Sequence, residues 1–434
     1  MILSRFRLMW LPVVAAGSLL GLSLLALSVT AATVVQDKSD LNSTLGRSED
    51  PVILTGAELA GFQGQPIADL VLYAFSSDTW SPIPFQIDER TNDITGTFVV
   101  FEDGLLDDND ELVFMAKDAG QAAGQAWPDD EEAQGNPRYE ILATDTLTSG
   151  DNGWAYLYRS TTLATSPDSY VDWNEALQKV TAISYTASFS PSAFLGLADL
   201  TINNNGVDIL DRQKTRVDTF ILDLNEESLI AFVDPTISIS VVGPVRGVAG
   251  AGQIGISIYG ARLDLKVEFD TSIVPLNIDG LRMSFDLNDP AVTGITNFYD
   301  SNGSDYPIDG SPDAVCQTPR FNWYQASGVP GGVVAVIPEA DAGDGIITNY
   351  YKDDDTFSAN DTGDKLSFAD TGLSIEDPGS IVSMVLSLYT LPPGSTANVG
   401  ASYYERVTNP LEVTTEIQSF VTNYTYLPAV LKPS

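Results

Sequence analysis

The stretch ARLDLKVEFD, residues 261–270, decides the fold class, because its apolar and charged residues alternate without a break. A β-strand points successive side chains to opposite faces of a sheet, so this pattern predicts one buried and one solvated face. The neighbouring stretches IGISIYG, residues 254–260, and IDGLRMSFDLN, residues 278–288, are similar in character. Such strands, joined by Gly, Asn and Asp turns, are typical of packed antiparallel sheets. We therefore predict an all-β chain with antiparallel β-sandwich architecture and few short helices.

The chain is long enough for two packed sandwich modules. The segment TTLATSPDS, residues 161–169, is rich in Ser, Thr and Pro and marks the expected boundary. Helix signals are confined to residues 173–180 and 191–200. The expected parts are a signal peptide or N-terminal anchor at 1–31, a linker at 32–50, an N-terminal β-sandwich module at 51–165, a larger β-sandwich domain at 166–420 and a C-terminal tail at 421–434.

The first residues have the layout of an export signal. Arg5 and Arg7 precede a run of apolar and small residues that ends near Ala31. The run is about as long as the roughly 20 residues that span a bilayer, so it predicts either a cleaved signal peptide or an uncleaved anchor. In both cases the remaining chain lies outside the cytoplasm, on the cell surface or free of the cell. Any membrane contact is then made through this N-terminal segment alone.

Composition excludes several classes of function. The chain has 59 acidic and 21 basic side chains, a formal net charge of -38, so nucleic acid is not an expected partner. It has no histidine and one cysteine, Cys316, which excludes Ser-His-Asp catalysis, His-ligated metal and an intramolecular disulfide. We expect Cys316 to be a buried small residue. The GAGQIG stretch at 250–255 precedes a strand pattern and no helix, so a nucleotide is not expected. Without histidine, haem is not expected either.

Acidic clusters make calcium the expected ion. Asp300, Asn302, Asp305 and Asp309 surround Gly303, and calcium takes six to eight oxygen ligands from flexible loops of this kind. A turn rich in Asp and Asn explains the same residues. Two other acidic stretches, at 102–111 and 353–364, are weaker candidates, and the first is better explained as the solvated turn of a hairpin.

Two polar or aromatic rows are candidate carbohydrate-binding residues. Trp154, Tyr156 and Tyr158 alternate, so a strand places the three rings on one face, where they stack on sugar units or form a core. A second row of Gln86, Asp88 and Arg90 lines a cleft or forms the solvated side of a sheet. A glycosidase needs two carboxylates flanking one bond, and 59 acidic residues offer too many pairs for the sequence to select one.

Several stretches carry a resemblance to known proteins: SPIPFQIDER at 81–90, the acidic stretch EDGLLDDNDELVFMAKDAG at 102–120, GWAYLYRS at 153–160, and NFYDSNGSDYPIDGSPD at 297–313. They resemble uncharacterised large secreted bacterial β-rich surface proteins. The ending YTYLPAVLKPS is similar to the Tyr-Leu-Pro tails of extracellular proteins from some filamentous bacteria. The resemblance implies secretion and a β-rich fold, and it brings over no catalytic residue.

Together these observations favour an extracellular or cell-surface β-sandwich protein that interacts with carbohydrate or the cell wall, with calcium as a candidate ion. One alternative is a polysaccharide-degrading enzyme, a lyase or glycosidase that works without histidine. The other is a structural component of a surface layer or filament. The sequence leans away from an enzyme and leaves the oligomeric state open.

Overall fold

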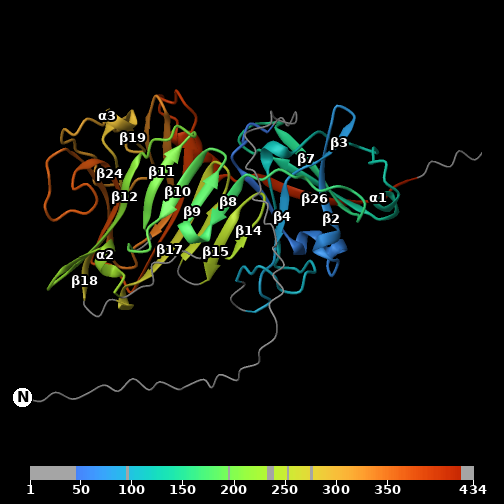
Figure 1. Cartoon of the computed structure of the whole chain (residues 1–434), viewed down its shortest axis with the longest axis horizontal. Helices are drawn as coiled ribbons and strands as arrows, with labels where there is room; N and C mark the ends of the chain where they lie inside the picture. The colour runs from blue at the N-terminus through green and yellow to red at the C-terminus, as the bar shows by residue number, and fades with distance from the viewer. Residues whose placement is uncertain are drawn as a thin grey trace, which may run out of the picture. The chain divides into compact units, whose positions relative to one another are not determined.

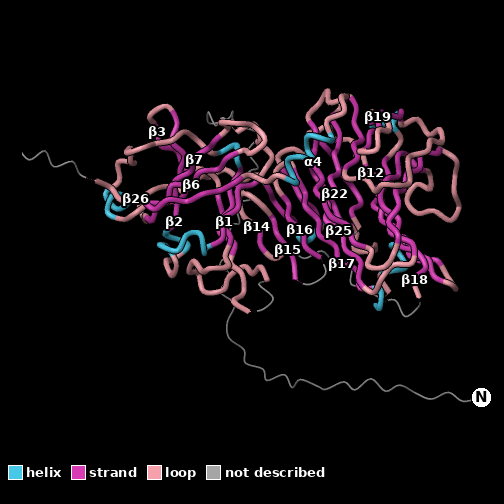
Figure 2. The backbone as a smooth tube through the Cα atoms, turned by 180° about the vertical axis from the view of Figure 1, so that it is seen from behind, coloured by secondary structure: helices cyan, strands magenta, loops and turns pink. Residues whose placement is uncertain are grey.

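A computed structural model describes residues 45–421 apart from 94–96, 194–195, 232–238, 252–253 and 274–276. The expected signal at 1–31, most of the expected linker and the tail from 422 onward lie outside the described residues. The described chain forms five antiparallel sheets with few short helices, as the alternating patterns predict (Figures 1 and 2). The all-β sandwich prediction is confirmed.

Two sheets enclose the N-terminal core. The smaller sheet has the strand order β1-β5-β4, with bounds Pro51–Thr55, Glu111–Met115 and Phe85–Asp88. The larger has the order β26-β6-β7-β2-β3, with bounds Glu412–Gln418, Arg138–Thr144, Asn152–Arg159, Leu70–Ser76 and Thr79–Pro82. The helical turns of this part are η1 (Gly56–Phe62), η2 (Ile67–Asp69), η3 (Ala116–Asp118) and α1 (Glu131–Gly135).

The larger sandwich packs a nine-stranded sheet against two shorter ones. The long sheet has the order β14-β15-β16-β17-β25-β22-β21-β19-β20, with bounds Val241–Val242, Gly247–Ala251, Ile254–Ile258, Arg262–Asp270, Ile381–Leu391, Gly331–Asp341, Trp323–Gly328, Ile295–Asp300 and Asp305–Pro307. Figure 2 shows this layer from behind, where β14 to β17, β25 and β22 lie side by side.

The opposing layer, in front in Figure 1, consists of two sheets. One has the order β11-β10-β9-β8, with bounds Leu197–Ile202, Tyr185–Phe189, Lys179–Ala182 and Val171–Asn174. The other has the order β13-β12-β18-β24-β23, with bounds Asp223–Asn225, Leu210–Thr219, Ile278–Leu287, Ser367–Glu376 and Ile346–Asp354. The remaining helices are η4 (Glu175–Leu177), α2 (Glu226–Leu229), η5 (Thr271–Ile273), α3 (Pro290–Thr293) and α4 (Gly400–Thr408).

The alternation of ARLDLKVEFD holds in β17, where Leu263, Leu265, Val267 and Phe269 are all buried in the core of the larger sandwich. The predicted helices at 173–180 and 191–200 are wrong. Strands β8, β9 and β11 run through both stretches, and among their described residues only the short η4 turn is helical. The apolar residues of β11 are buried against the opposing sheet, and this tertiary packing overrides local helix propensity.

The expected boundary at residue 165 agrees with the presence of two hydrophobic cores, but the chain crosses back over it. One hydrophobic core lies within the N-terminal sheets and another within the larger sandwich. However, β26, near the end of the expected second domain, pairs with β6 of the N-terminal part from Glu412–Thr144 to Gln418–Arg138. The final residues of the expected linker are also part of the fold, because Leu45, Arg47 and Asp50 are buried.

Candidate functional site

The aromatic row of β7 faces a covered cluster. Tyr156 and Tyr158 are completely buried, while Trp154 is partly exposed. The Trp80 ring lies edge-on to both tyrosines at centroid distances of 5.0 and 5.8 Å, and the Arg138 guanidinium lies 4.5 Å from the Tyr156 ring. Arg138 also donates to the Tyr158 hydroxyl at 3.0 Å. The two tyrosines therefore present no open row of rings to a sugar.

The polar row of β4 joins two parts of the fold. The Gln86 Oε1 atom accepts hydrogen bonds from the backbone amides of Val245 and Arg246, each at 2.9 Å. Arg246 Nε lies 2.8 Å from Asp88 Oδ2, and both side chains are buried. Burial raises the pKa of Asp88, although the Arg246 guanidinium opposes this shift. Gln86 and Asp88 are thus buried and hold the turn before β15.

Arg90, the third member of this row, is partly exposed and pairs with Glu111 at 2.8 Å. Glu111 also receives Arg246 Nη2 at 2.6 Å, so it links the two arginines. The row and its partners form one ion-pair network between β4, β5 and the β14–β15 turn. Sequence reasoning missed Arg246, because no local pattern indicates that it contacts Asp88, which lies 158 positions earlier in the chain.

The calcium candidate at residues 300–309 is held together by hydrogen bonds between its side chains and its own backbone amides. Asp300 is buried, and its Oδ1 atom accepts from the amides of Asn302 and Ser304 at 2.7 and 3.0 Å. Asp305 and Asp309 are exposed, and Asp309 caps its own turn through the amide of Ser311. Within the described residues, no group of three or more acidic, histidine or cysteine side chains is placed to hold a metal. Calcium therefore stays a prediction.

The acidic stretch at 102–111 is a structured turn. Asp110 is fully buried and accepts from the amides of Arg90 and Asp107 at 3.0 and 2.8 Å. Burial, together with the negative charges of Asp107 and Glu89, raises its pKa to about 6. The expectation of a solvated turn thus holds for the exposed residues Asp103 and Asp108 and not for Asp110. Cys316, expected to be buried, is exposed.

A charged cluster lies on the outer face of β12, β18 and β24. Lys214 Nζ lies 2.5 Å from Asp286 Oδ2 and 3.1 Å from Asp361 Oδ2. Lys214, Asp286 and Asp370 are at most 1% exposed, so no substrate reaches them in this structure. Burial and the negative charge of Asp370 raise the pKa of Asp286. Together with Arg216, which pairs with Asp361 at 2.7 Å, the cluster holds the β23–β24 connection onto the sheet.

A polar cavity lies where the segment before β1 meets the larger sandwich. It has a volume of about 290 Å³ and is lined by residues from β5, η3, β25 and several turns. Among them, Ser184 and Thr390 have hydroxyl oxygens 2.7 Å apart. The Lys117 ammonium lies 4.0 Å from the Tyr170 ring centroid. We call this cavity the junction pocket; its polar lining residues are Ser48, Glu49, Lys117, Tyr170, Ser184, Asn203 and Thr390.

A second cavity, of about 210 Å³, shares the same wall. Arg47 and Asp50 line it, whereas Ser48 and Glu49 line the junction pocket, so segment 47–50 separates the two. Asp50 is bound by Arg47 Nε at 2.7 Å, by Arg262 Nη1 at 3.3 Å and by the Tyr389 hydroxyl at 2.9 Å. Asp50 is thus paired internally, as Glu49 of the junction pocket is with Arg406, and the junction pocket is the larger of the two cavities.

Sequence reasoning missed the junction pocket because its residues come from seven or more separate segments. Segment 47–50 has the composition of a linker, and its burial depends on contacts with residues more than 350 positions away, such as the Arg47 bond to the Arg406 carbonyl at 2.7 Å. The position of Glu49 is fixed in part by Arg406 Nη1 at 3.1 Å. No local signal in the sequence could have indicated these pairings.

Comparisons with known proteins leave the family open. None of the helices in the described ranges has the length and apolar character needed to cross a bilayer. No protein-family model matches the sequence, and no curated protein matches it.

Two similar solved structures come from Enterococcus faecalis. An α-mannosidase is 8% identical with a TM-score of 0.44, covering 87% of this chain and 47% of its own. A protein in glycosyl hydrolase family 38 is 9% identical with a TM-score of 0.42, covering 88% of this chain and 49% of its own. The chain thus spans about half the length of each. Both TM-scores are below 0.5.

Proposed function

We propose that this protein is an exported, extracellular or cell-surface β-sandwich protein that binds a short saccharide in the junction pocket. The observation that carries the proposal is the lining of that pocket. Lys117 offers donors, and Glu49 and the hydroxyl oxygens of Ser184 and Thr390 offer acceptors, whereas the Asn203 amide already donates to the Pro330 and Leu391 carbonyls. Sugar hydroxyls donate and accept at once, so a ring of mixed donors and acceptors matches them better than it matches an apolar or singly charged ligand.

The size and place of the pocket support the same ligand class. Its volume of about 290 Å³ is near the lower end of small-molecule sites, which span about 300–1,000 Å³. Such sites occur preferentially where separate structural parts meet, as the N-terminal sheets and the larger sandwich do here. The N-terminal sequence supports export, which would bring the pocket to the polysaccharides of a cell wall or its surroundings.

A glycan array, followed by calorimetric titration of the best saccharide, tests the proposal. We expect Glu49→Gln to weaken binding by about tenfold or more, because a hydrogen bond to a charged group is worth about 1.5–3 kcal/mol. Glu412→Gln is the matched control, since Glu412 is exposed at the start of β26, and it should bind like the unchanged protein. An array without a hit, or equal affinity of both variants, contradicts the proposal.

The same saccharides, incubated with the protein and assayed for new reducing ends, separate binding from degradation. A binding protein leaves the reducing-end count unchanged. Release of reducing ends that is lost in Glu49→Gln would replace the proposal with the alternative of a polysaccharide-degrading enzyme. Silence in both assays would favour a structural role at the cell surface.

A further inference from the structure

Four connections converge at one end of the larger sandwich. They are the β12–β13, β17–β18, β22–β23 and β24–β25 connections, and the strand registers bring them together. Gly280 pairs with Glu376, and Ile346 pairs with Glu376 from the other side. The Thr271 amide donates to the Ser380 carbonyl at 3.0 Å. We call this region the acidic end; its described segments are residues 217–225, 269–273, 277–281, 340–347 and 375–383.

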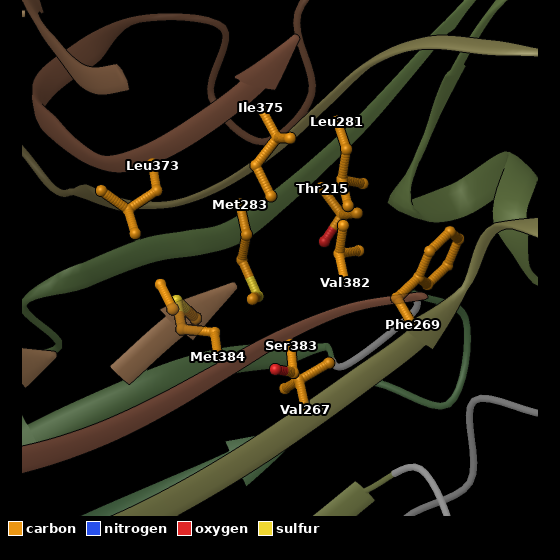
Figure 3. Close-up of a pocket in the computed structure, with 11 residues that line it drawn as sticks. Thr215, Val267, Phe269, Leu281, Met283, Leu373, Ile375, Val382, Ser383 and Met384 are labelled. Atoms are coloured by element: carbon orange, nitrogen blue, oxygen red, sulfur yellow. The ribbon is translucent and has the colours of Figure 1, made fainter. Parts of the chain in front are cut away.

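An apolar cavity opens between the two sheets at the acidic end. Figure 3 shows Met283 of β18 and Met384 of β25 pointing into it from opposite layers. Its walls are aliphatic, aromatic or thioether side chains apart from Thr215 and Ser383. The free volume is about 50 Å³, more than the roughly 10–15 Å³ that one water needs in the same measure. Because a dry apolar cavity lacks dispersion contacts, it gains by accepting an apolar group.

Large apolar side chains are exposed around this cavity. Phe220 and Ile221, in the β12–β13 turn, are 89% and 72% exposed. Ile346 and Ile381, the first residues of β23 and β25, are each more than half exposed. Exposed apolar side chains that gather around an apolar cavity and are rimmed by polar residues mark an interaction site.

The charge of the same region selects the partner. These segments contain no Lys, Arg or His and eight acidic residues: Asp218, Asp223, Asp270, Asp279, Asp341, Asp344, Glu376 and Asp377. The flanking residues Arg216 and Arg282 act on Asp218, and Arg216 is itself paired with Asp361. A second copy of this chain would bring the same eight carboxylates, and an anionic lipid surface or nucleic acid would be repelled likewise. A positively charged partner is attracted, and its association is steered by this local field.

We propose that the acidic end binds a cationic, amphipathic segment of another protein. Lysine or arginine side chains of the partner face the carboxylates of the connections, and one apolar side chain enters the cavity between Met283 and Met384. Phe220 and Ile381 cover the apolar face of the bound segment. This surface belongs to the far end of the larger sandwich and shares no lining residue with the junction pocket.

The test uses a synthetic peptide of alternating Lys and Leu and the full exported chain, with the dissociation constant measured by calorimetry at physiological salt. The triple variant Asp223→Asn, Asp344→Asn, Asp377→Asn should bind about tenfold or more weakly, since each exposed pair contributes little alone and the three add. The charge-matched control Asp129→Asn, Glu131→Gln, Asp172→Asn changes three exposed carboxylates elsewhere and should differ less than about twofold.

Two further measurements test the apolar part. Phe220→Ser leaves the charge unchanged at a position without buried contacts, and it should also weaken peptide binding. A peptide with Ser in place of Leu should bind more weakly than the Lys-Leu peptide. Equal losses in the two triple variants, full binding of the Lys-Ser peptide, binding to anionic phospholipid vesicles, or self-association of the chain through this end would each overturn the proposal.

Discussion

Buried carboxylates in this protein bind the backbone amides of nearby turns. Asp110, Asp300 and Asp353 are each at most 1% exposed, and each accepts from at least two amides. A carboxylate in this position offers charge-assisted hydrogen bonds that are about twice as strong as neutral ones. The acidic residues that look like metal ligands in the sequence are therefore partly committed to holding turns.

Asp353 provides the clearest test of this role. Its Oδ2 atom accepts from the amides of Asp309 and Gly310 at 2.9 and 3.1 Å, and its Oδ1 atom accepts from Ala369 at 3.3 Å. We expect Asp353→Ala to lower the free energy of unfolding by about 3 kcal/mol or more, because two buried amides and one partly buried amide lose their acceptor. Urea unfolding measures this loss.

Asp354→Ala is the control for that substitution. Asp354 accepts from the exposed turn amide of Thr356, so its replacement should cost less than about 1 kcal/mol. Equal losses in the two variants would show that the buried carboxylate has no special role.

Asp211 should make stability depend on pH. Burial and the negative charge of Asp364 raise its pKa to about 6. Since the unfolded value is about 3.9, the folded protein binds the proton first as pH falls, and stability rises between pH 6 and 4. Asp211→Asn should stabilise the protein by about 1 kcal/mol at pH 7, a value reduced for partial solvent screening, and flatten this dependence. Thermal unfolding at pH 7 and pH 4.5 measures both effects, and an unchanged slope would contradict the assignment.

At the scale of residues, the sequence predicted which side chains share one face of a strand. It did not predict which residues from other elements contact them. It placed Tyr156 and Tyr158 on one face of a strand, and the structure confirms that alternation. What covers this face comes from elsewhere: Trp80, Trp127 and Arg138 reach it from other strands and turns. Alternation is a local property of a strand, whereas the identity of the opposing residue depends on sheet pairing that no single stretch encodes.

Among the elements, β5 is buried on both faces. Leu112 and Phe114 belong to the core of the N-terminal sheets, while Val113 and Met115 belong to the core of the larger sandwich. The run ELVFM is continuously apolar after its first residue, which is typical of a strand covered on both sides. The sequence predicted this strand and not its second neighbour, because a short apolar run does not say what packs against each face.

Substitutions on the two faces of β5 should therefore cost similar amounts. We expect Phe114→Ala to lower the free energy of unfolding by about 3–5 kcal/mol and Met115→Ala by about 2–5 kcal/mol. The control Ile53→Ala, on neighbouring β1, removes a side chain that is 38% exposed and should cost less. A small loss for Met115→Ala alone would mean that the second face does not contribute to the core.

The loop after β19 is the element on which the calcium prediction depends. An ion there would compete with the Asn302 and Ser304 amides for Asp300. If calcium binds, excess calcium should raise the unfolding temperature relative to chelator by several degrees, through preferential binding to the folded state. Asp300→Asn should abolish that difference, and identical melting curves in calcium and chelator would remove the prediction.

At the scale of the whole molecule, distant parts of the chain close the fold. The segment around Arg47 contacts residues 406–409, and β26 adds an edge strand to the N-terminal sheet. The sequence placed both outside the N-terminal module, as linker and as second domain. Composition marked the change between the two cores, but it could not show that the chain returns, because that return rests on contacts over hundreds of residues.

Arg246 couples the N-terminal sheets to the larger sandwich. Its side chain binds Asp88 of β4 at 2.8 Å and Glu111 of β5 at 2.6 Å, and it donates to the Tyr259 hydroxyl at 3.3 Å. Removing one partner of a buried ion pair costs about 3–5 kcal/mol, because the other charge stays buried without compensation. Arg246→Met should thus weaken the contact between the N-terminal sheets and the larger sandwich more than it weakens either core.

Scanning calorimetry measures this coupling. We expect one heat-absorption peak for the unchanged protein and two for Arg246→Met, since each core has its own apolar cluster and would then unfold separately. The control Arg159→Met removes a partly exposed arginine 4.0 Å from Asp69 and should keep a single peak. If Arg246→Met also gives a single peak at lower temperature, the cores remain joined through β5, whose two buried faces supply the alternative connection.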